Sequence, residues 1–483
     1  MTALLISLAV LVGGYFIYGL VVEKIFGVDS SRLMPAATRY DGIDYVEMPT
    51  WKVFLIQFLN IAGLGPIFGA IMGVMFGPAA FLWIVLGTIF GGAVHDFISA
   101  MMSVRSGGDS LPELVGRELG PVIKQVIRIV STVLLILVGA VFILTPAGLL
   151  AGMTPGWMNV NFWIAAIFIY YLLATLLPID KLIGRIYPLF GGALLFMALG
   201  LLYVLIFKGH PIPDGFSDGL FNRHPAADSH PLFPMMFVSI ACGAISGFHA
   251  TQSPMMVRCL KNEKLARPVF YGAMVAEGIV ALIWAAAAIT FTGGYSQLAD
   301  YMTTHTTGDM VHNISVEWLG TFGGILALLG VIAAPITTGD TALRSARLTV
   351  ADFLHISQKK FIKRILVSLP LFAATFTLMM IDFDVLWRYF AWTNQTLAAF
   401  TLWAATVYLA RHRRFFYICL IPALYMTMVV VTYILVAPTP EGFGMPFNYA
   451  VLSAAAVDFI CLTMFIRYLV LSRSGRLVHD VAY

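Results

Sequence analysis

Five apolar stretches of this 483-residue chain contain ionisable side chains well inside their boundaries. A charge at the centre of a bilayer costs roughly 2.5–3.5 kcal/mol on insertion scales, so each such residue is a candidate for ion binding or charge movement. Histidine also changes its charge near neutral pH and can couple a proton to movement. The alternative for each residue is a hydrogen-bonded packing group. The residues are His95, Asp96, His249, Glu277, Asp340 and Asp458.

Glycine, proline and polar side chains interrupt two apolar stretches near their midpoints, in "FLIQFLNIAGLGPIFGAIMG" and "GAISGFHATQSP". Inside hydrocarbon such residues are tolerated mainly where they face protein or a watery cavity. The exposed N–H groups of a half-helix attract an anion, and the exposed C=O groups attract a cation. We therefore expect the chain to be non-helical near Ser246 to His249, facing a break at Gly63 to Pro66. The alternative is that the glycines only permit close helix packing.

The glycine, proline and polar residues at these two interruptions are the candidate substrate-binding residues. They are Asn60, Gly63, Gly65, Pro66, Ser246, Gly247, His249, Thr251, Gln252 and Ser253. Adjacent residues of a helix point about 100° apart, so His95 and Asp96 of a neighbouring stretch need not contact each other. One of them can face a cavity while the other pairs elsewhere.

A cluster of oxygen-bearing side chains lies in "VIAAPITTGDTALRSARL", where Thr337, Thr338, Asp340 and Thr341 occupy one and a half helical turns. Hydroxyls with one carboxylate suit a monovalent cation or a proton-accepting acid. We expect this cluster in the cytoplasmic third of its apolar stretch. The alternative is a helix end that Thr and Asp cap before a basic loop.

The composition indicates which elements position these residues. The chain is 60% hydrophobic and only 11% charged, which is typical of a polytopic membrane protein. A membrane-spanning helix needs about 20 mostly apolar residues. Thirteen stretches, numbered here as spans 1 to 13, meet this condition: 2–26, 53–76, 79–103, 124–150, 160–178, 186–207, 234–257, 268–292, 313–341, 363–381, 386–410, 415–437 and 448–470. The sequence therefore predicts an all-α protein with about 13 transmembrane helices.

The distribution of basic residues predicts the orientation, because cytoplasmic loops retain Lys and Arg. With the N-terminus outside and the C-terminus in the cytoplasm, all but three of the 29 Lys and Arg fall on the cytoplasmic side or at its border. The exceptions are Lys208, Arg223 and Arg388. The net charge of +4 then reflects membrane topology, so we expect a bilayer as partner and no nucleic acid.

Spans 2 and 7 carry the two interruptions, lie five spans apart and run in opposite directions in this topology. This arrangement is typical of a five-plus-five inverted repeat, in which the first helix of each half is broken near the midplane. The predicted organisation is a first helix and cytoplasmic connector (1–52), a transport core (53–410, with repeats 53–207 and 234–410), and further helices with a cytoplasmic tail (411–483).

Several long motifs resemble the carbon starvation protein A (CstA) family, in the order expected for it. They include "DGIDYVEMPTWKVFLIQFLNIAGLGPIFG", "GTIFGGAVHDFISAMMSVRSGGDSLPELV", "IACGAISGFHATQSPMM", "NEKLARPVFYGAMVAEGIVALIWAA", "APITTGDTALRSARL" and "LWRYFAWTNQTLA". The resemblance implies a bacterial inner-membrane permease for pyruvate with protons or for peptides, near the amino acid–polyamine–organocation superfamily with its LeuT-like core. This chain is shorter than the longest family members, so substrate knowledge transfers weakly.

The resemblance also implies a candidate cation site. In sodium-coupled proteins of that wider fold, Na⁺ lies between the first broken helix and hydroxyls of the eighth core helix. The corresponding positions here are Ala62, Gly65, Thr337, Thr338 and Thr341. Asp340 adds an acid where hydroxyls would suffice, which leaves H⁺ and Na⁺ both open.

The combined expectation is a secondary transporter for a small carboxylate or short peptide, coupled to H⁺ or Na⁺ and without another cofactor. The candidates for ion coupling are His95, Asp96, Glu277, Thr337, Thr338, Asp340 and Thr341. No G-x-x-x-x-G-K-[ST] or H-E-x-x-H motif is present, which argues against an ATP-driven pump and a metal-dependent enzyme. The alternative is a channel or a nutrient-sensing membrane protein without coupled transport.

Overall fold

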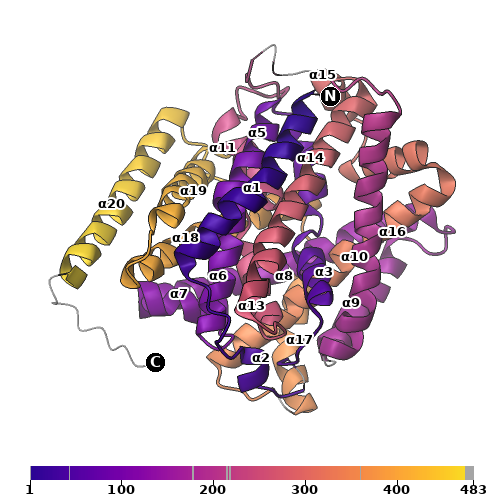
Figure 1. The fold of residues 1–483 in the computed structure, drawn as a ribbon. Coiled ribbons are helices and arrows are strands. Elements are labelled where there is room, and N and C mark those ends of the chain that lie inside the picture. The colour runs from indigo at the N-terminus through magenta and orange to yellow at the C-terminus, as the bar shows by residue number, and fades with distance from the viewer. Residues whose placement is uncertain are drawn as a thin grey trace.

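The computed structural model describes residues 2–473 except 43, 177–178, 214–215, 217–218 and 359. Within these ranges the chain is helical with connecting turns and contains no strand (Figure 1), as the all-α prediction requires. The last part of the predicted cytoplasmic tail, 474–483, lies outside the described residues.

The first half of the chain contains one long N-terminal helix, a connector and a series of packed helices. Short π-helical segments, η1, η2 and η4, precede three of the α-helices of the whole chain, and η3 is a 3-10 helix. The elements are α1 (Thr2–Phe26), α2 (Pro35–Thr38), α3 (Thr50–Ile61), η1 (Gly65–Gly69), α4 (Ala70–Val74), α5 (Ala79–Leu86), η2 (Gly87–Gly92), α6 (Ala93–Arg105), α7 (Leu111–Leu119), α8 (Pro121–Met153), α9 (Val160–Leu176) and α10 (Ile179–Phe207).

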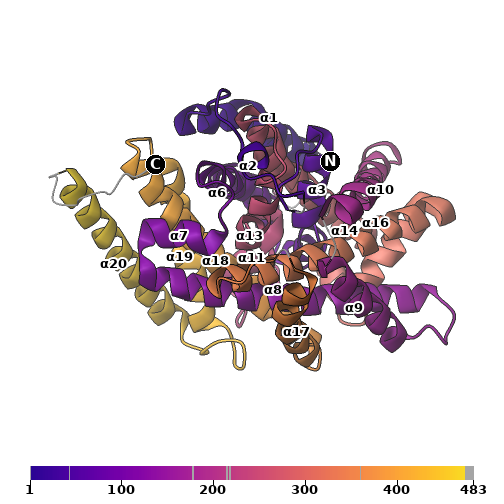
Figure 2. The ribbon, with the colours of Figure 1, turned by 90° about the horizontal axis from the view of Figure 1, so that it is seen from below.

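The second half begins with three short consecutive helices and ends with two long ones at the periphery (Figures 1 and 2). Its elements are α11 (Leu232–Ser239), α12 (Ala241–Ala244), α13 (Gly247–Val257), η3 (Glu263–Leu265), η4 (Arg267–Tyr271), α14 (Gly272–Thr292), α15 (Tyr295–Tyr301), α16 (Thr307–Phe353), α17 (Phe361–Leu378), α18 (Phe383–Arg411), α19 (Tyr417–Val436) and α20 (Phe447–Arg473).

Nine helices of the described chain are long and apolar enough to cross a membrane. A further pair, Thr50–Ile61 with Gly65–Val74, passes the same criterion together but is bent by 54°. The three remaining predicted spans are also helical. They correspond to the shorter helix α9, to α11–α13 and to α18. The structure thus supports a multi-pass membrane protein, and every predicted span falls on helix.

Span 2 bends where its sequence contains Gly63, Gly65 and Pro66. Helix α3 ends at Ile61, and Pro66 occupies the first turn of η1, where a missing N–H group is tolerated. Span 7 is broken at Ile245 (φ −157°, ψ 134°) and at the following serine (φ −144°, ψ 121°), both extended.

The predicted non-helical segment of span 7 is therefore only partly confirmed. Ser246 is extended and occupies the N-cap position, but α13 begins at Gly247, so the residues from Gly247 to His249 are already helical. The break ends earlier than expected because an extended N-cap residue is enough to start the next helix.

The two breaks pack directly against each other near the middle of the bundle. A Cβ atom on Gly65 would lie 2.0 Å from Cβ of Cys242, and a Cβ atom on Gly69 would lie 2.7 Å from the carbonyl oxygen of Ser239. Only glycine permits this approach of η1 to α11 and α12. In Figure 2, α13 lies near the centre of the helices, where it continues the chain after the break.

Span 9 differs from its predicted boundaries. Helix α16 contains one non-helical residue, Gly320 (φ 70°), and then continues to Phe353, so its membrane-spanning part is Gly323–Phe353. Thr337 to Thr341 consequently lie near the middle of this helical segment. The alternative of a capped helix end is wrong, because the helix continues beyond Thr341 through two arginines whose side chains are buried.

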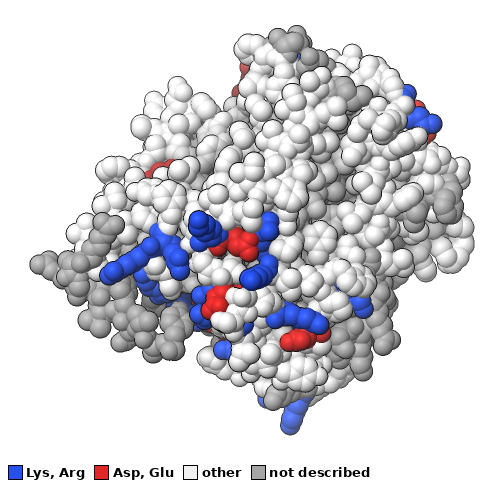
Figure 3. Space-filling view, viewed as in Figure 1, with Lys and Arg blue, Asp and Glu red and all other residues white. Residues whose placement is uncertain are grey.

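Charged side chains concentrate toward one end of the molecule. In Figure 3 most of the Lys and Arg side chains on the visible face lie in its lower half, below the middle of α1. The same end contains α2, which belongs to the connector between α1 and α3, residues 27–49 (Figure 1). This is the end that the charge distribution predicts to be cytoplasmic, and α15 lies at the opposite end.

The contact between the breaks predicts the effect of adding one methyl group. Gly65→Ala should lower the free energy of unfolding by about 1–3 kcal/mol, because its Cβ overlaps Cys242. Thermal unfolding of the detergent-purified protein measures the change. Gly192→Ala in α10 is the control, since nothing lies within 4 Å of its added Cβ. Equal melting temperatures for both variants would show that the breaks are not tightly packed.

Candidate functional site

Helices α6, α13 and α14 bring four of the predicted ionisable residues into one contact chain. Nδ1 of His95 lies 2.7 Å from Oδ1 of Asp96, and Nδ1 of His249 lies 2.8 Å from Oδ2 of the same carboxylate. Nε2 of His249 lies 3.4 Å from Oε2 of Glu277. All four side chains are fully buried. His95 and Asp96 thus contact each other, although their helical spacing did not require it.

Close helix packing explains why Asp96 reaches span 7. A Cβ atom on Gly92, at the end of η2, would lie 2.3 Å from the carbonyl oxygen of Ala244. The start of α6 therefore lies directly against α12, and Asp96 is in its first turn. Thr88 of η2 donates to the carbonyl oxygen of Gly243 (3.2 Å), which satisfies an acceptor next to the break.

The proton positions in this chain follow from its acceptors. An ionised Asp96 accepts only, so Nδ1 of each imidazole donates to it. Nε2 of His249 then faces Glu277, and one proton can reside on either of these two groups. Neither the oxygens of Glu277 nor Nε2 of His249 have a hydrogen-bond partner among the described residues, so the contact of 3.4 Å between them is an electrostatic one. Buried carboxylates need compensating charge or protons, so this cluster is suited to take up and release a proton.

A residue of α18 caps the break in span 7. Oδ1 of Asn394 accepts hydrogen bonds from Oγ of Ser246 (3.0 Å) and from the backbone N–H of Phe248 (2.7 Å). A Cβ atom on Gly247 would lie 2.3 Å from the backbone nitrogen of Ala398, so α13 starts in direct contact with α18. Asn394 was not among the predicted site residues. Its position in an apolar span, where an amide needs partners, was the available signal.

Two of the three threonines in the predicted cluster of span 9 face the break in span 2. Oγ1 of Thr338 donates to the carbonyl oxygen of Leu59 (2.9 Å), and Oγ1 of Thr341 lies 3.2 Å from Oδ1 of Asn60. The hydroxyl of Thr337 instead bonds carbonyl groups of its own helix. The predicted cation position between spans 2 and 9 therefore has Thr338 and Thr341 beside it, next to Gly63 and within reach of backbone oxygens.

Asp340 is turned away from both breaks. Its Oδ2 accepts from the hydroxyl of Tyr187 on α10 (2.7 Å), and this hydroxyl also lies 3.1 Å from the carbonyl oxygen of Thr337. Oδ1 of Asp340 has no hydrogen-bond partner within the described part of the chain. Sequence analysis missed Tyr187, because no local pattern connects it to span 9.

The remaining predicted residues have structural contacts. Ser253 and Thr251 bond carbonyl groups within α13, and the amide of Gln252 donates to Thr251 (2.9 Å). Gln57 of α3 lies 3.5 Å from Ser253, which links the two broken spans. Asp458 lies on α20 at the periphery and does not join the cluster of His95, Asp96, His249 and Glu277.

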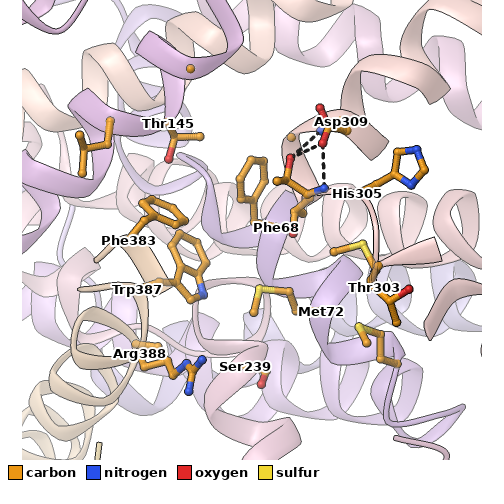
Figure 4. Close-up of a pocket in the computed structure, with 18 of the residues that line it drawn as sticks. Phe68, Met72, Thr145, Ser239, Thr303, His305, Asp309, Phe383, Trp387 and Arg388 are labelled. Atoms are coloured by element: carbon orange, nitrogen blue, oxygen red, sulfur yellow. Dashed lines mark hydrogen bonds between the residues drawn. The ribbon is translucent and has the colours of Figure 1, made fainter. Parts of the chain in front are cut away.

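A cavity of about 1190 Å³ lies on the side of the breaks that is predicted to be external. Its wall includes Phe68, Met72, Ser239, Trp387 and Arg388, together with the turn between α15 and α16 (Figure 4). Through Phe68 of η1 and Ser239 of α11, the cavity reaches the two broken spans.

Aromatic side chains separate this cavity from the breaks. The ring centroids of Phe68 and Trp387 are 6.0 Å apart, those of Trp387 and Phe390 are 5.4 Å apart, and those of Phe390 and Phe142 are 5.9 Å apart. Phe142 packs on Gly63, where an added Cβ would lie 2.7 Å from its ring. These rings form a continuous series of contacts from the cavity wall to the break in span 2.

Among the described residues of the cavity wall, Arg388 carries a permanent positive charge and pairs with Glu441. Two histidines of the wall are poorly suited to carry charge. Burial and, to a smaller extent, the neighbouring His230 lower the pKa of His224 to about 4. Burial also lowers the pKa of His230, and the positive charge of Arg388 adds to this effect. Near neutral pH these two imidazoles therefore add little positive charge to the cavity wall.

Comparison with known proteins identifies relatives. A family model described as carbon starvation protein CstA matches residues 1–171 and 157–317. An uncharacterised membrane protein of Haemophilus influenzae is 42% identical over 341 residues, which are 60% of this chain and 91% of that protein. A protein named peptide transporter CstA from Bacillus subtilis is 29% identical over 541 residues, with 89% of each chain covered.

Two further matches are more distant. A protein of Escherichia coli named pyruvate/proton symporter BtsT is 28% identical over 338 residues, but only 57% of this chain and 47% of that protein are covered. Among solved structures, a mutant manganese transporter of Eremococcus coleocola matches with a TM-score of 0.51 and 13% identity, over 89% of this chain and 97% of that one. At this identity the structural match shows a shared fold only.

The contacts of Asp340 predict a stability effect. Tyr187→Phe should lower the free energy of unfolding by roughly 1–3 kcal/mol, because it leaves a buried carboxylate without its hydrogen-bond donor. Thermal unfolding in detergent measures this loss. Tyr203→Phe on the same helix is the matched control, since Tyr203 is 56% exposed. A stable Tyr187→Phe protein would contradict the assigned hydrogen bond.

Proposed function

The chain belongs to the carbon starvation protein CstA family, and from this premise we propose that it is a secondary active transporter. It imports a small pyruvate-like carboxylate or a short peptide across the bacterial inner membrane by alternating access, and H⁺ drives the import. The observation that carries this proposal is the contact chain of Asp96, His249 and Glu277 beside the break in span 7.

The proposed architecture is a five-plus-five inverted repeat within residues 53–410, with extra helices on either side. The bend of 54° in span 2 and the break at Ile245 in span 7 support it, because they lie five predicted spans apart and pack on each other. The fold shared with a transporter over 89% of this chain is consistent with it. The N-terminus is proposed to be external and the C-terminus cytoplasmic.

The proposed substrate carries a carboxylate. Relatives are named for peptide transport and for pyruvate/proton symport, and both kinds of substrate present this group. The cavity of about 1190 Å³ is large enough for either and is the proposed entry path. The carboxylate is proposed to dock where Ser246 and the N-terminus of α13 meet Asn394. A helix N-terminus favours an anion.

H⁺ is proposed as the coupling ion in preference to Na⁺. The cluster of His95, Asp96, His249 and Glu277 lies against the break, so a change in its charge acts on the helix that moves. Asp340 is instead held between α16 and α10 by Tyr187. The hydroxyls of Thr338 and Thr341 remain the proposed position for Na⁺ if sodium proves to be the driving ion.

Transport in proteoliposomes tests the proposal. With radiolabelled pyruvate or dialanine and an inward proton gradient, we expect accumulation above equilibrium. If one proton is moved with each substrate anion, so that no net charge crosses, the internal substrate concentration should exceed the external one roughly tenfold per pH unit of gradient. Separate arms supply a sodium gradient or no gradient.

Each arm of this experiment has a distinct meaning. Accumulation that follows the sodium gradient alone would replace H⁺ by Na⁺ at the threonine position. Flux that only equilibrates and ignores both gradients would identify a channel. Failure to move either compound would overturn the transport proposal for these two substrate types.

A single substitution tests the coupling residues. Glu277→Gln should abolish gradient-driven accumulation while it preserves exchange of internal for external substrate, because the amide cannot carry the proton that His249 shares with the carboxyl group. Asp228→Asn in an exposed loop is the control and should accumulate normally. Proton-driven accumulation by Glu277→Gln at the wild-type level would remove Glu277 from the coupling path.

A further inference from the structure

Four arginine side chains are buried on the side of the breaks that faces the connector. Arg344 is 0% exposed and Arg347 2% exposed on α16, while Arg258 after α13 and Arg364 on α17 are each 8% exposed. Burying a guanidinium group is costly unless an anion or several hydrogen-bond acceptors compensate it. The hydrogen-bond partners of each guanidinium group therefore indicate whether its charge is compensated within the protein.

Three of the four arginines are held by neutral acceptors. Arg258 donates twice to the carbonyl oxygen of Gly108 (3.0 and 2.8 Å) and lies over the ring of Tyr45. Arg347 donates to the side-chain oxygen of Gln358 (2.5 Å), and Arg364 donates to the backbone oxygen of Gln358 (2.7 Å). None of these acceptors brings a negative charge.

Arg344 has the most unsatisfied donors of the four, although Nε of Arg347 also lacks an acceptor within the described part of the chain. One of its nitrogens donates to the carbonyl oxygen of Ala174 (2.6 Å), but Nε and Nη1 have no hydrogen-bond acceptor among the residues that the structure describes. The acid within 4 Å is Asp44 of the connector, whose Oδ1 lies 3.9 Å from Nη1 and is itself buried without a hydrogen bond. Asp340, one helical turn before Arg344, also attracts this guanidinium group but does not form an ion pair with it. This distance allows charge attraction but is too long for a hydrogen bond.

The position of Arg344 connects it to the proposed transport path. It lies one helical turn beyond Thr341, whose hydroxyl contacts Asn60 next to the break in span 2. Its neighbour Ser345 donates to the carbonyl oxygen of Thr251 on α13 (2.9 Å). Arg344 itself lies on the helix face of Asp340 and donates to α9, so it is at the level of α16 that a solute moving from the breaks toward the connector would reach, beside the face that carries Ser345.

We propose that Arg344, assisted by the charge of Arg347, is a second carboxylate-binding site, which receives the substrate on its way out toward the cytoplasm. Asp44 holds this position in the present state and competes with the substrate for it. The identity of the carboxylate as transported substrate rests on the proposed function. The evidence for the site itself is that Arg344 has unsatisfied donors and that the carboxylate of Asp44 lies 3.9 Å from one of them.

This competition would link release to the connector. Oδ1 of Asp41 accepts hydrogen bonds from the backbone N–H groups of Asp44 and Tyr45 (both 2.9 Å). The Tyr45 hydroxyl lies 3.3 Å from the carbonyl oxygen of Gly107, and the backbone N–H of Met48 donates to the carbonyl oxygen of Cys259 (3.1 Å). The connector is thus tied to the ends of α6 and α13, and displacement of Asp44 by a substrate would loosen it.

Equilibrium binding of radiolabelled pyruvate and dialanine to the purified full-length protein tests the site without transport. Asp44→Asn should lower the apparent Kd by about threefold or more, because it removes the competitor. Arg344→Gln should weaken binding at this site on the order of a hundredfold. In the double variant Asp44→Asn with Arg344→Gln, the increase in affinity caused by Asp44→Asn should disappear. Arg39→Gln, an exposed connector arginine that pairs with Asp109, is the control.

The outcomes separate the site from the function. Unchanged binding by Asp44→Asn, or a gain that persists in the double variant, would overturn the site even if Arg344→Gln alone fails to fold. A gain seen only with inorganic phosphate would overturn the carboxylate assignment, and dependence on phosphatidylglycerol would assign Arg344 to a lipid headgroup. The expected binding pattern without any proteoliposome uptake would uphold the site and reject the proposed function.

Discussion

A helix broken inside a membrane must find partners for its freed backbone groups within the protein, because hydrocarbon supplies none. Span 7 meets this constraint through two neighbours. Asn394 of α18 accepts from Phe248 and Ser246, and Thr88 of η2 donates to the carbonyl group of Gly243. The break can persist only while these helices stay packed against it. The glycines that permit this packing are therefore as important as the polar groups.

The same packing decides where charge can be buried. Because Gly92 lets α6 approach α12, Asp96 meets the imidazole of His249, and this imidazole meets Glu277 from the other side. A group that changes charge here acts directly on the start of α13. Asp340 lies only three residues beyond Thr337 on the same helix. It is instead bound by Tyr187 and belongs to the contact between α16 and α10.

The connector side of the breaks differs in chemistry from the cavity side. The cavity side is closed by a layer of aromatic rings that includes Trp387 and Phe390. The connector side is closed by buried guanidinium groups, of which Arg344 is held least well. Aromatic rings can rotate without leaving a charge uncompensated, whereas a buried guanidinium group favours an anion. The two closures would therefore respond to different features of a substrate.

The amino-acid sequence by itself determined the helical class, the approximate positions of the long apolar helices and the two interruptions, because hydrophobicity, glycine and proline act over a few neighbouring residues. It also indicated His95, Asp96, His249 and Glu277, since ionisable groups are rare in apolar spans. Only the tertiary structure decided which of these groups meet. It also decided that the break in span 7 ends at Ser246 and that Asn394 caps it. These contacts join residues far apart in the chain, and their geometry depends on how closely the helices pack.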